Sequence, residues 1–160
     1  MQLFIQLIII SIYSGIAYFF VQPLNNWLML VIGLILGFLF LLFDEKLGYK
    51  YYAQNQQLGV ANLSSVQNKA LISRSIIFLF VFIPLSLFVI TSSGSPIGVG
   101  MIISMGFIYS QELWQIINSP ELFFQKYLWQ TGKRWSGKEI KIFTRIFILI
   151  IILLAILALV

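Results

Sequence analysis

Long apolar runs restrict this chain more than any other feature of its sequence. Within its 160 residues, stretches of about 17–21 mostly apolar residues recur, and an α-helix of that length crosses roughly 30 Å of hydrocarbon. We therefore expect an all-α, polytopic integral membrane bundle of five transmembrane helices plus a short interfacial helix, in one domain over residues 1–160. The expected spans are about 3–21, 27–43, 75–91, 97–117 and 142–160, and polar segments cover 44–74 and 118–141.

The composition favours a membrane protein and excludes several chemistries. Hydrophobic residues make up 60% of the chain and charged residues only 9%, against about 25% charged in a typical soluble protein. The sequence has no cysteine and no histidine, which excludes disulfides, thiolate zinc sites, iron–sulfur clusters, histidine-ligated haem and Ser-His-Asp or Cys-His catalysis. We expect no cofactor and no metal. The first run lacks a basic segment before it and a small-residue cleavage site after it, so we interpret it as a retained span.

The basic residues gather around the two polar segments and predict an orientation. Alternation of five spans puts the N-terminus and both segments on one side, and both short turns and the C-terminus on the other. Positive charge near span ends resists translocation, so the basic side is expected to face the cytoplasm, in a plasma or inner membrane. A re-entrant hairpin made of the third and fourth runs keeps this orientation and remains an alternative. The basic residues are Lys46, Lys50, Lys69, Arg74, Lys126, Lys133, Arg134, Lys138, Lys141 and Arg145.

Pairs of small residues four apart allow helix backbones to approach closely in lipid. Gly33 and Gly37 form a GxxxG in the second run, and Ser11 and Gly15 repeat the spacing in the first. These pairs are candidate helix-packing residues, within the chain or against a partner. Glycine is also frequent in membrane spans without any special role, and the sequence leaves that alternative open.

Glu112 is the acidic residue that lies within an apolar run. At about 1.5 Å per residue it lies roughly 7–8 Å inside the cytoplasmic end of the fourth span. An ionisable group at that depth is a candidate functional site, because it could pair with a base, carry a proton or bind a cation. Alternatively the span ends early and the carboxylate lies in the hydrated interface. The nearby Trp114 favours this alternative, because tryptophan is enriched at the level of the headgroups. The candidate polar site comprises Glu112, Gln111, Tyr109, Ser104 and Gln115.

Two helix starts frame a basic and aromatic stretch in the second polar segment. Ser119 and Pro120 predict an interfacial helix over about 120–130, and Ser136 with Glu139 matches a capping box that starts the fifth span. Cations with aromatic rings suit nucleic acids, but also anionic headgroups. Because spans flank this stretch, we expect headgroup contact and no nucleic acid. The expected contact residues are Lys126, Trp129, Lys133, Arg134 and Trp135.

The shortage of reactive groups favours a small non-enzymatic membrane protein. It would act as a scaffold, accessory or assembly subunit through its packing faces and basic cytoplasmic surface, with other membrane subunits or a second copy as partners. The alternative is a small oligomeric transporter or channel that uses Glu112 and the polar residues near it. A lipid-modifying enzyme with Glu112 or Asp44 as its base is a third hypothesis, for which no nucleophile–base pair is apparent.

Overall fold

The computed structural model describes residues 2–57, 72–92, 94–128, 131 and 135–159. The predicted all-helical architecture is confirmed, since these residues form helices and contain no strand. In chain order the elements are α1 (Gln2–Phe20), α2 (Leu24–Gln57), the 3₁₀ helix η2 (Ile72–Arg74), α3 (Ile76–Ser92), α4 (Pro96–Ile116), α5 (Pro120–Phe123), the π-helix η3 (Phe124–Leu128) and α6 (Gly137–Leu157).

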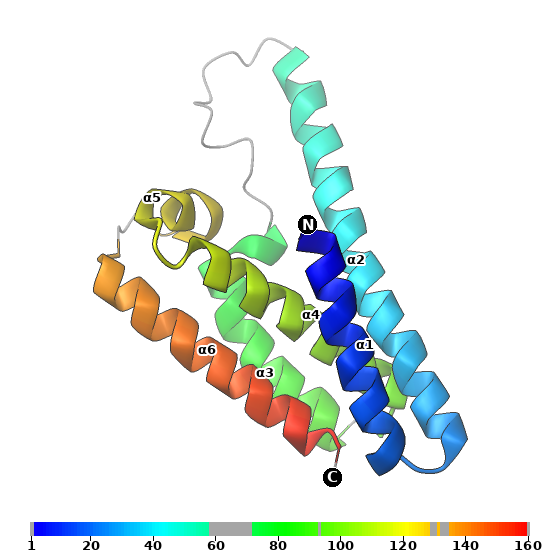
Figure 1. Ribbon diagram of the computed structural model, residues 1–160. Helices are drawn as coiled ribbons and strands as arrows, with labels where there is room; N and C mark the ends of the chain where they lie inside the picture. Colours follow the sequence, from blue (N-terminus) through cyan, green and yellow to red (C-terminus); the bar gives the residue numbers. More distant parts are fainter. Residues whose placement is uncertain (1, 58–71, 93, 129–130, 132–134, 160) are drawn as a thin grey trace.

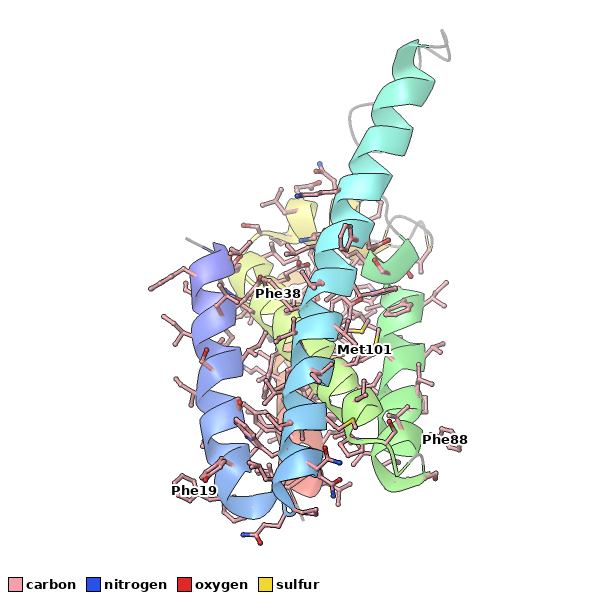
Figure 2. All side chains as sticks on the ribbon, turned by 90° about the vertical axis from the view of Figure 1, so that its right-hand side faces the viewer. Phe19, Phe38, Phe88 and Met101 are labelled. Atoms are coloured by element: carbon pink, nitrogen blue, oxygen red, sulfur yellow. The ribbon has the colours of Figure 1, made fainter. Side chains whose placement is uncertain are left out.

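Three of the described helices are long and apolar enough to cross a membrane. They cover Leu3–Phe20 of α1, Leu24–Asp44 of α2 and Gly137–Leu157 of α6, while α3 is apolar but has 17 residues. Large apolar side chains on the outer faces are exposed, such as Phe19 and Phe88, which point away from the bundle in Figure 2. Water-soluble monomers rarely expose large contiguous apolar patches, so these helices indicate a membrane location. The sequence predicts five spans, whereas three of the described helices qualify as spans by length and composition. The count of five therefore stays a prediction.

α4 is the central helix of the bundle. It packs against α1, α2, α3, α5 and α6, which lie around it in Figure 1. Its buried residues include the polar Ser104 and Glu112 beside the apolar Ile103 and Leu113. A helix enclosed by other helices has little contact with lipid, so polar side chains are tolerated on it. This position accounts for the low apolar content of the fourth run.

The contact between α2 and α4 is the most extensive in the bundle, and it depends on glycine. A Cβ atom added at any of three glycines would overlap a carbonyl oxygen of the facing helix. The overlaps are Gly33 with Ile97, Gly37 with Met101, and Gly100 with Leu30. Gly15 differs, because a Cβ added there has no atom within 4 Å, and Ser11 on the same helix is exposed.

α1 is held to its neighbours by hydrogen bonds from two aromatic side chains. The Tyr13 hydroxyl donates to the carbonyl of Ala155 at 3.1 Å, and the Trp27 indole donates to the carbonyl of Ser14 at 2.9 Å. Ala155 lies in the last turn of α6, where helix carbonyls have no partner within the helix. Tyr13 thus satisfies a backbone group that lipid could not.

The N-terminus and α5 lie at one end of the bundle, and the C-terminus lies at the other (Figure 1). We call the first of these the N-terminal end. α2 continues beyond the bundle at this end, as Figures 1 and 2 show. Its 34 residues correspond to about 51 Å at 1.5 Å per residue, well over the roughly 30 Å of a hydrocarbon core. The first part of the expected polar segment 44–74 is therefore a helical extension of the second span.

Candidate functional site

Glu112 lies at the centre of a buried polar cluster at the N-terminal end. Its side chain forms ion pairs with Arg74, at 2.7 Å from Nη2 to Oε1, and with Lys126, at 2.8 Å from Nζ to Oε2. The Tyr127 hydroxyl donates to the same Oε2 at 3.0 Å. Glu112 is only 7% exposed and Arg74 only 6%. Both carboxylate oxygens therefore have cationic partners in a site with little access to water.

The side chains of this cluster come from three separate elements. Arg74 is the last residue of η2, one residue before α3 begins, and Glu112 lies in the last turns of α4. Lys126 and Tyr127 are neighbours within η3. Adjacent residues of a regular helix diverge by about 100°, whereas both of these side chains reach one oxygen atom. Lys126 and Tyr127 reach the same oxygen because both side chains are long, and the π-helical turn in which they lie is a feature that is frequent at functional sites.

Aromatic packing fixes the position of η3. Tyr127 is fully buried, and its ring centroid lies 5.5 Å from that of Phe123, which is also fully buried. The Phe123 ring in turn stacks on Trp135 at 5.9 Å and meets Phe143 of α6 edge-on at 6.3 Å. Burial, with the nearby Glu112 carboxylate next in importance, raises the pKa of Tyr127 well above its usual value. Tyr127 thus remains a neutral hydrogen-bond donor at physiological pH.

A second hydrogen bond connects the cluster to α2. The Ser73 hydroxyl donates to Oδ2 of Asp44, the residue at which the apolar part of α2 ends. Because Ser73 precedes Arg74, the short helix η2 is bound on one side to α2 and on the other to α4. The cluster therefore joins four parts of the chain that the sequence separates.

The ion pairs border a partly open cavity of about 130 Å³. Arg74, Glu112 and Lys126 form its polar wall together with Gln6 of α1. The rest of the lining is apolar and comes from α1, α2 and α4, namely Leu3, Phe38, Leu41, Leu42 and Ile108. The cavity is thus lined partly by charged side chains and partly by apolar side chains.

The structure separates the residues of the candidate polar site. Glu112 is central, and the buried Tyr109 lies near it, with its ring 5.4 Å from Phe82. Ser104 is fully buried further along α4, and Gln115 is exposed. Gln111 is partly exposed.

The residues expected to contact headgroups also differ in their surroundings. Lys126 forms the ion pair with Glu112, and its side chain is 30% exposed. Trp135 is partly buried in the aromatic packing around Phe123. Trp129, Lys133 and Arg134 lie outside the described residues.

Sequence reasoning missed Arg74 and Tyr127 as partners of Glu112. A usable signal existed, because Arg74 directly precedes the third run and the expected topology places it at the same end as Glu112. The described residues contain no group of three or more acidic side chains that could hold a metal ion. Comparison of the chain with protein-family models, with curated proteins and with solved structures gives no match.

Proposed function

We propose that this chain is a non-enzymatic, five-span membrane protein that acts as a scaffold or accessory subunit, with its N-terminus in the cytoplasm. The main support for the proposal is that both carboxylate oxygens of Glu112, the one acidic residue within an apolar run, already have partners. Arg74 and Lys126 take both of its oxygens, and Tyr127 adds a hydrogen bond. A carboxylate engaged in this way connects helices, whereas a general base or an ion carrier needs an oxygen atom that is accessible to its substrate.

The projecting part of α2 supplies a surface through which a scaffold would act. Its sequence after Asp44 carries Lys46 and Lys50, three tyrosines and a glutamine-rich end. A helix that starts within an apolar bundle and continues beyond it holds such residues at a fixed distance from the membrane. This arrangement suits contact with a cytoplasmic partner more than it suits chemistry.

Single-cysteine labelling tests the proposed topology, and the absence of native cysteine makes each variant specific. Ser92→Cys replaces an exposed residue at the end of α3, and Lys138→Cys replaces an exposed residue near the start of α6. Ser92 is preferred to Gly94, whose φ of +58° disfavours any other residue. We expect an impermeant maleimide to label position 92 from outside intact cells, and position 138 only after permeabilisation. Labelling of position 138 in intact cells, or protection of position 92, would reject the five-span arrangement.

Site-specific photocrosslinking in cells tests the scaffold role. A photoreactive phenylalanine analogue at Tyr51, on the projecting helix, is expected to give one discrete protein adduct. The matched control is the same analogue at Phe88, which is 61% exposed on α3 and should react with lipid. Equal adduct patterns at the two positions would contradict the role of the projecting helix.

The transporter alternative makes a different prediction for Glu112. If the carboxylate carried protons or cations, purified protein in liposomes would dissipate an ion gradient, and Glu112→Gln would abolish the flux. The scaffold proposal expects no flux above that of empty liposomes for either protein.

A further inference from the structure

The outer face of α6 carries a row of exposed side chains that is basic in its first half and apolar in its second. Successive members are three or four residues apart, so they lie along one face of the helix. Buried residues of α6 such as Phe147 and Leu154 lie on the other side, where the helix packs against α3, α4 and α5. We call this row the outer stripe, and its members are Lys138, Lys141, Arg145, Leu149, Ile152 and Ile156.

Arg145 is the unusual member of the outer stripe. It lies eight residues after Gly137, about 12 Å into a helix that is long and apolar enough to cross a membrane. Ionisable residues within spans almost always face the interior of the bundle or pair with an opposite charge. Arg145 is exposed instead, and in the part of the chain that the structure describes neither it nor Lys138 nor Lys141 forms an ion pair. An anion from outside the chain would offset the cost of placing this cation there.

The acidic residue of α6 lies outside the outer stripe. Glu139 lines the groove between α3 and α6 together with Phe80 and Phe143, and its Oε2 accepts a hydrogen bond from the backbone N–H of Ser136 at 2.7 Å. Consecutive residues of a helix diverge by about 100°, so Glu139 points away from Lys138. The stripe therefore presents its three cations with no carboxylate of α6 among them.

Helix geometry directs these cations toward the cytoplasmic headgroups. The side chains of a helix lean toward its N-terminus, and α6 begins at the N-terminal end of the bundle (Figure 1), which is the proposed cytoplasmic side. Long basic side chains use this direction to reach the interface while their alkyl parts stay in the hydrocarbon. The backbone of Arg145 thus lies within the hydrocarbon, and its guanidinium extends toward the phosphates.

We propose that the outer stripe binds one anionic phospholipid of the cytoplasmic leaflet, with its phosphate on the three cations and an acyl chain along the apolar half. The stripe and the lipid have the same order of parts, charge followed by hydrocarbon. Arginine binds phosphate through two parallel hydrogen bonds, and basic residues beside spans attract anionic lipids. A partner helix would have to bring its own acidic residue into the hydrocarbon, which is costly, whereas a lipid carries its phosphate at the interface. This inference rests on the membrane arrangement proposed above.

Native mass spectrometry of the detergent-solubilised chain tests the site, with phosphatidylglycerol and phosphatidylcholine as the probes. We expect one phosphatidylglycerol to bind about tenfold more tightly than phosphatidylcholine, and Arg145→Gln to remove about tenfold of that affinity, as the loss of a hydrogen bond to a charged group would. Arg145→Lys keeps the charge and should retain part of the affinity. Lys46→Gln is the matched control, because Lys46 is an exposed cation on another helix, α2, and it should leave the affinity unchanged. All three positions are exposed, so these variants are expected to fold.

A phosphatidylglycerol with a photoreactive diazirine in its acyl chain tests the apolar half of the stripe. Irradiation should attach it to residues 146–157 of α6, and Arg145→Gln should lower the yield of that adduct. Adducts on α1, whose outer face is apolar and exposed, should keep their yield in the same variant. Equal binding of the two lipids, an equal loss of affinity in Lys46→Gln, or equal adducts on α1 and α6 would overturn the site. A homo-oligomer that Arg145→Gln disrupts without changing lipid binding would assign the stripe to a second copy of the chain instead.

The labelling experiment separates this inference from the proposed function. Absence of lipid selectivity together with the expected labelling at positions 92 and 138 rejects the lipid site alone. An altered labelling pattern rejects the membrane arrangement, and the lipid site with it.

Discussion

Replacing glycine by alanine at the α2–α4 contact should destabilise the bundle, although alanine is the better helix former. A Cβ on Gly33 would lie 2.8 Å from the carbonyl carbon of Ile97 and 2.9 Å from its Cα, whereas carbon atoms in contact are about 3.5–4.0 Å apart. Both groups belong to helix backbones and cannot rotate away, so the helices must separate by roughly 1 Å. Overpacking of this kind costs about 1–3 kcal/mol, and a rigid backbone places Gly33→Ala near the upper limit.

The preference of helices for alanine opposes this loss. It is worth up to about 1 kcal/mol, which leaves a net destabilisation of about 2 kcal/mol for Gly33→Ala. Gly15→Ala is the matched control, because its Cβ meets no atom within 4 Å, and it should be neutral or stabilising by up to about 1 kcal/mol. Gly106→Ala falls between them, since its Cβ would lie 3.0 Å and 3.1 Å from the side-chain carbons Cγ2 and Cδ1 of Ile151, which can move.

The free energy of unfolding can be measured for this series in mixed micelles with increasing sodium dodecyl sulfate, followed by circular dichroism. The expected order of stability is Gly15→Ala, then Gly106→Ala, then Gly33→Ala. A double variant with Gly37→Ala should lose less than the sum of its parts, because a single separation of the helices relieves both overlaps. If Gly33→Ala proved as stable as Gly15→Ala, the close approach of α2 and α4 would be refuted.

Three further predictions concern the polar cluster and the start of α6, and the same assay measures them. Glu112→Gln leaves the buried Arg74 and the partly exposed Lys126 without their carboxylate and should destabilise the protein by about 3 kcal/mol, whereas the exposed Lys138→Gln should change stability by less than about 0.5 kcal/mol. Tyr127→Phe removes the hydrogen bond to that carboxylate with little change in volume and should cost about 1.5–3 kcal/mol, so an unchanged midpoint would contradict the bond. Ser136→Ala removes the cap of α6 and should cost about 1 kcal/mol, while Glu139→Gln, which keeps a capping-box residue, should cost much less; equal losses would argue against the box.

Most helix positions follow from the sequence because membrane helices are encoded locally. Apart from the C-terminal end of α2, the long helices begin and end within about five residues of the expected spans. The capping box of Ser136 and Glu139 is confirmed, with its two hydrogen bonds at 3.3 Å and 2.7 Å. Apolar runs and caps each depend on neighbours a few residues apart. Local patterns therefore suffice to predict them.

The continuation of α2 and the composition of the cluster depend on longer-range information. Polar residues after Asp44 mark the end of an apolar run, but they do not end a helix, since lysine and glutamine are good helix formers. Arg74 lies 38 residues from Glu112 along the chain, and no local pattern joins them. Lys126 is a cation in the polar segment between two apolar runs, but no pattern in the sequence around it pairs it with Glu112.

The central position of α4 has a consequence for how the protein is made. An isolated segment that contains Glu112, Gln111 and two serines inserts poorly into a bilayer, because each polar side chain opposes transfer from water. Inside the bundle the same segment is surrounded by apolar helices, and Gly33 and Gly37 allow α2 to pack closely against it. The helices α1 and α2 leave the ribosome first, so they are present when α4 reaches the membrane. If α4 is one of the five proposed spans, its insertion is a step of folding that depends on docking onto the earlier helices, rather than an independent event set by its own hydropathy.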